Sequence, residues 1–306
     1  MDREEDRIMR NIGIVILLLF PAILHAEHLF EMGLHGGLTG WNGKTEYIES
    51  RIGFQGGAHL YYDYFSPDII GFRTGVTIDC HNASLSKTKY EDSYSVIDAQ
   101  DEQMDIRYSI NELKERYMIY SVGIPLQLAL TIKDLHLFAG AKVVFPFANN
   151  WNQSVRHAAL AVYYPKYDNI VEESYPLAAS RDFTMDNSGH LALPNIQWWF
   201  TAELSYTIPI NTWSRRYRSY IMVGTYFDYC FTRYTPSHSD AVSLIMLSDT
   251  RDGFPLQRVL TPVIEANRQG RKLVTDGALF DVGIKISYAI TPYNPHRRSS
   301  HSCNCL

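Results

Sequence analysis

The feature that most constrains this chain is an alternation of apolar and polar residues with a period of two, which recurs in eight separate stretches. In the last stretch one face carries Val282, Ile284 and Ile286, and the opposite face carries Asp281 and Lys285. Successive side chains of a β-strand point to opposite sides, so each stretch predicts a strand with one apolar and one polar face. The stretches cover about 28–40, 50–65, 70–85, 115–131, 135–146, 196–209, 218–233 and 277–290.

The connections between these stretches alternate strictly between short and long. The short ones are 66–68, 133–134 and about 211–217, whereas the long ones are about 41–49, 86–114, 147–195 and 234–276. The last three far exceed the usual connection of roughly four to six residues. Antiparallel neighbours would place every short turn at one end of the sheet and every long loop at the other. An even number of strands with this arrangement is typical of outer-membrane barrels.

A water-soluble β-sandwich would show the same alternation with its apolar face inside, so the connection lengths favour the barrel. A mean hydropathy of −0.18 excludes a bundle of membrane helices. The net charge of −5 and the pI near 6.1 argue against a nucleic-acid partner. Because every backbone polar group must be paired inside a bilayer, the sheet has to close. The predicted fold is all-β, an eight-stranded antiparallel up-and-down transmembrane β-barrel over residues 27–290.

The N-terminal segment 1–26 has the features of a secretory signal peptide. Arg7 and Arg10 precede an apolar run over 12–24, and Ala26 is a small residue at the expected cleavage point. The run is shorter than the roughly 20 residues of a membrane-spanning helix and contains Pro21. A retained anchor is the alternative. The acidic residues before Met9 leave open whether translation starts at Met1 or Met9.

The four cysteines do not form an obvious disulfide framework. Strand parity places Cys80 on the outward face and Cys230 on the inward face, so we expect them not to bridge. Cys303 and Cys305 lie in a polar tail, 291–306, for which disorder is the simplest interpretation. A metal site formed with neighbouring histidines is a weaker alternative, and we expect no cofactor.

Nine charged residues share the inward face of the predicted barrel. These are Glu31, Asp63, Arg73, Asp79, Lys142, Glu203, Asp228, Asp281 and Lys285. An eight-stranded barrel leaves room only for its own side chains, so an open pore is not expected. The cluster could line a narrow polar path, but an unpaired charge there is costly, which favours a structural network of ion pairs. With six acids and three bases, some carboxylates need water or a histidine proton.

Catalytic chemistry has weak support in the sequence. An esterase would need a serine beside a histidine. Strand parity separates inward His81 from outward Ser84, and His238 lies in a long connection beside Ser239. We therefore predict that the chain is not an enzyme, with an outer-membrane lipid-modifying hydrolase kept as an alternative.

The long loops are the most informative functional feature, because they combine aromatic and acidic residues. Tyr90 and Tyr94 occur in one, and Trp151, Tyr163 and Tyr167 in another. Exposed aromatics of this kind are typical of recognition surfaces, although the loops could instead fold over the mouth. The expected role is binding, adhesion or envelope organisation, with outer-membrane lipids and an unknown extracellular ligand or envelope protein as partners. An accessory component of a secretion system, acting through the short turns and the tail, is a further alternative.

The glycine-rich first strand at 32–37 and the closing strand at 280–288 resemble those of small Gram-negative outer-membrane β-barrel domain proteins, of the OmpA/OmpX type and the PorT-like group. The resemblance covers about residues 28–290 and implies a bacterial outer-membrane location. It brings no catalytic residues with it. Such barrels often end at an aromatic residue, whereas about 16 residues follow Ile290 here.

Overall fold

The computed structural model describes residues 27–44, 47–65, 70–97, 100–171, 180–191, 193–210, 217–233, 243–247, 258–268 and 271–292. The predicted signal peptide and the tail from residue 293 onward lie outside the described residues, as do His238, Ser239, Cys303 and Cys305. The predicted boundary at residue 290 falls inside the last strand, which ends at Pro292. No helix in the described ranges has the length and apolarity needed to cross a membrane.

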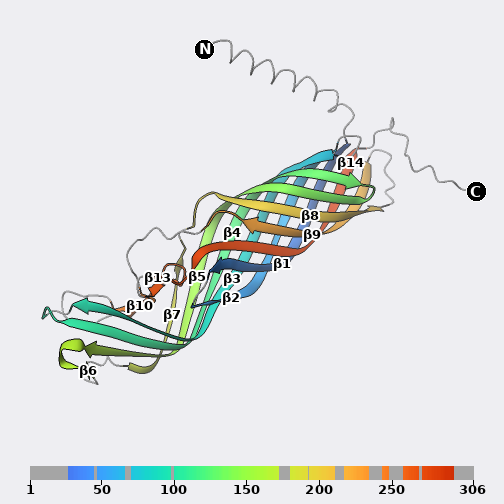
Figure 1. Ribbon diagram of the computed structural model, residues 1–306. Coiled ribbons are helices and arrows are strands. Elements are labelled where there is room, and N and C mark those ends of the chain that lie inside the picture. The colour runs from blue at the N-terminus through green and yellow to red at the C-terminus, as the bar shows by residue number, and fades with distance from the viewer. Residues whose placement is uncertain are drawn as a thin grey trace, which may run out of the picture.

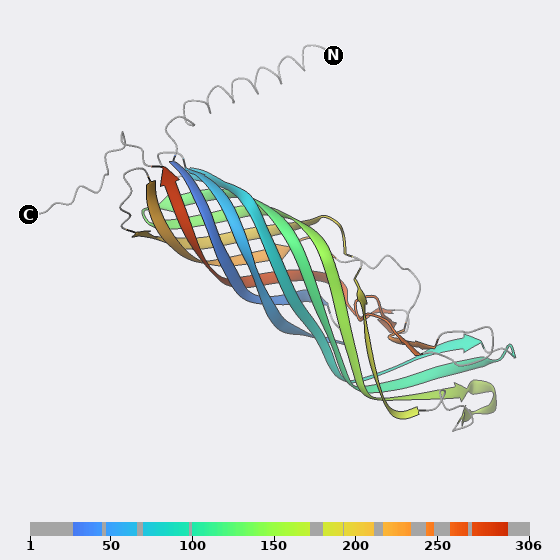
Figure 2. The same cartoon turned by 180° about the vertical axis from the view of Figure 1, so that it is seen from behind.

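The chain forms a closed antiparallel barrel of eight strands, which confirms the predicted fold class (Figures 1 and 2). Each strand pairs with its neighbour in sequence order, and the last strand pairs with the first. Each of the eight alternating stretches predicted from the sequence lies within one barrel strand or overlaps most of that strand. The strands are β1 (Glu27–Lys44), β2 (Glu49–Phe65), β3 (Ile70–Ile97), β4 (Gln103–Ile132), β5 (Leu135–Tyr164), β8 (Gln197–Ile210), β9 (Tyr217–Cys230) and β14 (Thr275–Pro292).

The two faces of the barrel differ sharply in polarity. Leu128 and Ile284 point outward and are each 68% exposed, whereas Asp281 and Lys285 point inward and are 1% and 3% exposed. The outward apolar residues surround the part of the barrel nearest the short turns, which we call its lower part although it is uppermost in Figures 1 and 2. We call this ring the apolar belt; on β4 it extends from Tyr120 to Ile132.

Two of the predicted long loops are largely strand, and the prediction of loops there was wrong. β3 and β4 run on together as far as the pair Ile97 and Gln103, and β5 continues to Tyr164. The segment after β5 contains the 3-10 turn η1 (Pro165–Tyr167), β6 (Asn169–Val171) and β7 (Ser180–His190), and both strands pair with β5. These extensions form a sheet that bends away from the barrel (Figure 2). We call it the arm, comprising residues 86–97, 103–114 and 152–164 with η1, β6 and β7.

A line of irregular residues marks where the arm begins. Lys89, His157 and Asp182 have positive φ angles of 61°, 50° and 59°. Between β3, β4 and β5 the pairing omits one residue on each strand at this level, Lys89, Asn111 and His157, so the register between these strands is unchanged. On β3 the buried positions change from odd-numbered residues up to Leu85 to even-numbered residues from Tyr90 onward, so the period-two pattern that identified the lower strands breaks at this level.

The fourth long connection covers the mouth of the barrel. It contains β10 (Ile245–Leu247), β11 (Arg258–Leu260), β12 (Asn267–Arg268) and β13 (Arg271–Lys272). We call residues 243–247, 258–268 and 271–274 the cap. Leu244 and Ile264 of the cap belong to the same buried apolar cluster as Ile110 and Leu113 of the arm. This cluster is a second core, separate from the polar barrel interior.

Candidate functional site: the polar interior and the capped mouth

Arg73 organises the lower part of the barrel interior. Its Nε donates to Asp63 Oδ1 at 2.6 Å and its Nη2 to Asp63 Oδ2 at 2.8 Å. Nη1 donates to Glu203 Oε2 at 2.9 Å, and Nη2 also donates to Glu31. The planar guanidinium can meet several carboxylates at once through fixed donors, which a lysine ammonium cannot reproduce. One buried cation therefore holds together carboxylates from three strands.

Lys285 completes this lower group. Its Nζ lies 2.9 Å from Glu31 Oε1 and also contacts Glu203. His59 Nε2 lies 3.2 Å from the same Glu31 oxygen, and Ser287 Oγ donates to Glu31 Oε1 at 2.6 Å. All of these charged groups are buried. Protein donors reach both oxygens of each carboxylate, as buried charges require.

A second group lies nearer the mouth, around Lys142. Its Nζ is 2.7 Å from Asp228 Oδ2 and 3.3 Å from Asp79 Oδ2. Asp79 also contacts His35 Nε2 at 2.6 Å and accepts from Thr77 Oγ1 at 2.7 Å. The single ammonium is shared by two acids, and the remaining acceptor positions of Asp79 are taken by a hydroxyl and a histidine.

The structure places all nine predicted charged residues in the barrel interior. Eight of them fall into the Arg73–Lys285 and Lys142 groups, and the ninth, Asp281, lies 3.1 Å from His81 Nδ1. The sequence alone does not pair His35, His59 and His81 with particular carboxylates. The alternation places these histidines on the inward faces, but pairing them with an acid requires the register between strands.

Little open space remains between the two groups. A cavity of about 20 Å3, lined in part by Tyr61, Thr201 and Tyr226, separates them. That volume holds about one water molecule. At this level the described side chains fill the lumen.

At the mouth, Glu115 of β4 joins the barrel wall to the cap. Its carboxylate accepts the backbone N–H of Val263 at 2.9 Å and the Gln153 amide at 2.8 Å, and it also accepts the Tyr117 hydroxyl. Gln153 donates to the backbone oxygen of Thr261 at 3.1 Å. Burial raises the pKa of Glu115 well above its ordinary value, because the charged form loses its hydration there.

The aromatic residues predicted for recognition differ in burial: some are buried under the cap and others are exposed on the arm. Tyr90 and Trp151 are buried in the core under the cap. Tyr90 and Tyr108 donate to Asp92 Oδ2, each at 3.2 Å, and burial raises the pKa of both phenols. Tyr167, at the far end of the arm, is 57% exposed. The long connections therefore cover the mouth with some aromatics and display others.

The structure separates the serine and histidine of β3 that were considered for nucleophilic chemistry. His81 is buried inside the barrel, whereas Ser84 faces outward on the same strand. Within the described ranges, no group of three or more His, Cys, Asp or Glu side chains is arranged to hold a metal ion. Cys80 and Cys230 are both free, as strand parity predicted.

Comparison with known proteins gives only distant structural similarity. No protein-family model matches the chain, and no curated protein sequence matches it. The crystal structure of Ail, the attachment invasion locus protein of Yersinia pestis, in complex with the heparin analogue sucrose octasulfate, is 7% identical with a TM-score of 0.25. A second Ail structure is 8% identical with a TM-score of 0.24, and for both the match covers 88% of this chain and 99% of that chain. A Pseudomonas aeruginosa FadL homologue is 8% identical with a TM-score of 0.15, over 88% and 90% of the two chains. Similarity at this level does not define a family for this chain.

Proposed function

We propose that the chain is a bacterial outer-membrane β-barrel with a closed lumen, and that its arm and cap serve binding, adhesion or envelope organisation at the cell surface. The apolar belt around a charged interior carries this proposal. In architecture the proposed barrel would resemble the small OmpA/OmpX-type and PorT-like barrels. The proposal includes no enzymatic step.

The belt has the size and character of a lipid-facing surface. On β4 it runs from Tyr120 to Ile132, against the roughly 9–11 residues that a tilted strand needs to cross a bilayer. Water-soluble proteins rarely expose a continuous apolar surface larger than a few hundred Å2. Beyond Tyr120 the outward residues of β4 include Arg116 and Lys114, so the apolar character stops before the arm begins.

The packed interior supports a role other than diffusion of solutes. Arg73, Lys142 and Lys285 are each held by two or more carboxylates, and moving one aside would leave buried charges unpaired. The cap covers the mouth above them. The interior ion-pair network and the cap both close the barrel. We therefore expect its function to lie in the surface that the arm and the cap present outside the membrane.

The arm is the part best placed for recognition. It extends beyond the cap, and its tip carries Tyr167 and Ile170, which are exposed (Figure 1). An ordered sheet keeps such side chains in fixed positions, which lowers the entropy cost of binding. The partner would be an extracellular ligand or another envelope protein.

The test uses cells expressing the full chain. We expect the protein to fractionate with outer membranes, to require detergent for extraction, and to migrate differently on gels with and without heating. An epitope inserted at residues 100–101 should be accessible on intact cells, whereas one inserted between Lys133 and Asp134 should become accessible only after permeabilisation. Extraction without detergent would contradict the membrane location, and large conductance steps in planar bilayers would contradict the closed lumen.

A further inference from the structure

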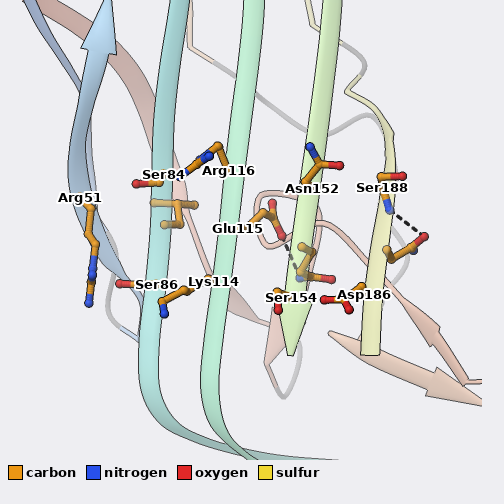
Figure 3. A pocket seen from close by; sticks show the side chains of 13 residues that line it. Arg51, Ser84, Ser86, Lys114, Glu115, Arg116, Asn152, Ser154, Asp186 and Ser188 are labelled. Atoms are coloured by element: carbon orange, nitrogen blue, oxygen red, sulfur yellow. Dashed lines mark hydrogen bonds between the residues drawn. The ribbon is translucent and has the colours of Figure 1, made fainter. Parts of the chain in front are cut away.

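A shallow groove of about 540 Å3 lies at the base of the arm, where β2, β3, β4, β5 and β7 run side by side (Figure 3). Most of its side chains are hydroxyls, amides and cations. The lining residues are Arg51, Ser84, Leu85, Ser86, Lys114, Glu115, Arg116, Asn152, Gln153, Ser154, Asp186, Asn187 and Ser188. Neither the polar interior nor the cap uses its outward-facing members.

Strand register arranges these outward side chains in two rows. Arg51 pairs with Ser84, Ser84 with Arg116, Arg116 with Asn152, and Asn152 with Ser188, which gives one row across five strands. The second row, two residues farther out, contains Ser86 and Lys114 with their partners on β5 and β7. Arg51 and Arg116 are two strands apart, or about 10 Å between backbones.

The two arginines of the first row are not neutralised. Lys114 pairs with Glu112, and Asp186 pairs with Arg156 at 2.9 Å. Arg51 and Arg116 form no ion pair with any residue in the described part of the chain, although both are exposed. The groove therefore has a surplus of positive charge between its neutral polar groups.

Ser86 gives an independent indication of a ligand. It is 4% exposed, and its Oγ has no hydrogen-bond partner among the described residues. A buried hydroxyl without a partner destabilises the protein, because it has lost its hydration without gaining a hydrogen bond. An acceptor bound in the groove beside the arginines would satisfy it.

The groove lies at the upper boundary of the apolar belt. Moving from the first row toward the short turns, the next outward side chains are Phe54, Asn82 and Met118, which are register partners. Tyr120 and Val122 follow on β4. If the belt lies in hydrocarbon, the arginines lie at the level of the lipid head groups.

We propose that the groove binds the phosphate groups of an anionic lipid head group in the leaflet that surrounds the barrel. The proposal rests on the membrane location proposed above. Arg51 and Arg116 would each bind phosphate oxygens through paired N–H donors, the geometry that favours arginine over lysine. Ser86 would donate its free hydroxyl, and the spacing of the two arginines suits a head group with two phosphates. A lipid at this place would brace the base of the arm.

The test reconstitutes the full chain in phosphatidylcholine nanodiscs, with or without diphosphorylated lipid A, and measures retained lipid A by native mass spectrometry. The wild type should retain lipid A, and the double variant R51Q/R116Q should bind it at least about tenfold more weakly, since the phosphates lose the charged hydrogen bonds of both arginines. S86A should have a smaller effect in the same direction. The matched control is R107Q, because Arg107 is exposed on the same strand within the arm.

Further measurements distinguish failure of this inference from failure of the proposed function. Equal retention of lipid A by wild type and R51Q/R116Q would overturn the inference, provided that both insert into phosphatidylcholine discs. Binding of inorganic pyrophosphate that matches lipid A in affinity and depends on the two arginines would also overturn it, in favour of a soluble anion. Failure of the wild type to insert into lipid would instead count against the proposed function.

Discussion

The guanidinium carbon of Arg73 lies 3.3 Å from the centroid of the Phe138 ring. The ring covers one flat side of the cation, while the N–H donors along the edge meet Asp63, Glu203 and Glu31. An aromatic face attracts a cation, and it excludes water from the group that the carboxylates bind. Phe138 and Arg73 thus form the centre of the lower interior network.

Substitution of Arg73 by Met should destabilise the barrel strongly. Three buried carboxylates would lose their shared cation, and breaking a buried ion pair from one side typically costs about 3–5 kcal/mol. Urea unfolding in lipid vesicles, followed by the heat-sensitive gel shift, measures the effect. Arg107→Met in the arm is the control, and a value for Arg73→Met within about 0.5 kcal/mol of wild type, as for surface changes, would contradict the network's importance.

The cap should loosen as the pH rises. Burial raises the pKa of Glu115 in the closed state. Its stabilising contribution is therefore fully present below the ordinary carboxyl pKa of about 4.3 and is lost as the pH rises through the raised value. Hydrogen exchange of backbone amides in 258–268 should be slower at acid pH than at alkaline pH, after correction for intrinsic exchange rates.

Glu115→Gln should remove this pH dependence, because the amide stays neutral and can still accept the Val263 N–H. Glu112→Gln on the outer face of the same strand should leave the dependence unchanged. Corrected exchange rates that do not vary with pH in the wild type would argue against Glu115 as the controlling group.

The sequence predicts the lower barrel well because one physical rule governs it. Within the apolar belt every residue faces either outward or into the lumen, so period-two alternation fixes the side on which Asp281 or Leu126 lies. The same rule places His35, His59 and His81 inside. It cannot identify their partners, since Arg73 and Glu203 meet across 130 positions of sequence and only the register brings them together.

The arm and the cap could not be predicted in the same way. The positive φ angles at Lys89 and His157 shift the alternation, so apolar residues such as Ile106 and Ile110 appear out of phase with the lower strands. Those residues are buried against Leu244 and Ile264, which come more than 130 positions later. A single strand pattern contains no information on such a contact.

Gly37→Val should weaken the seam where the barrel closes. Gly37 pairs with Gly283 of β14, and a Cβ at Gly37 would lie 2.5 Å from the Gly283 Cα and would also overlap the Val282 backbone. Neighbouring Gly36 provides a matched control, because its Cβ would find its nearest atom at 3.6 Å, an ordinary contact. We expect Gly37→Val to lower the yield of heat-modifiable protein on refolding and Gly36→Ala to leave it unchanged. Equal yields for the two variants would mean that the seam is able to relax.

Leu126→Arg tests whether the apolar belt faces hydrocarbon. Leu126 lies midway along the belt on β4 and points outward. An arginine at the bilayer midplane of a barrel costs about 2–4 kcal/mol, whereas the same residue near or beyond the interface costs little. Gln103→Arg, at the arm end of the same strand, is the control for the change in charge. Unfolding free energies measured in lipid vesicles should fall for Leu126→Arg alone. If both variants match the wild type, the belt does not lie in a bilayer, because water would accommodate the arginine equally well at either position.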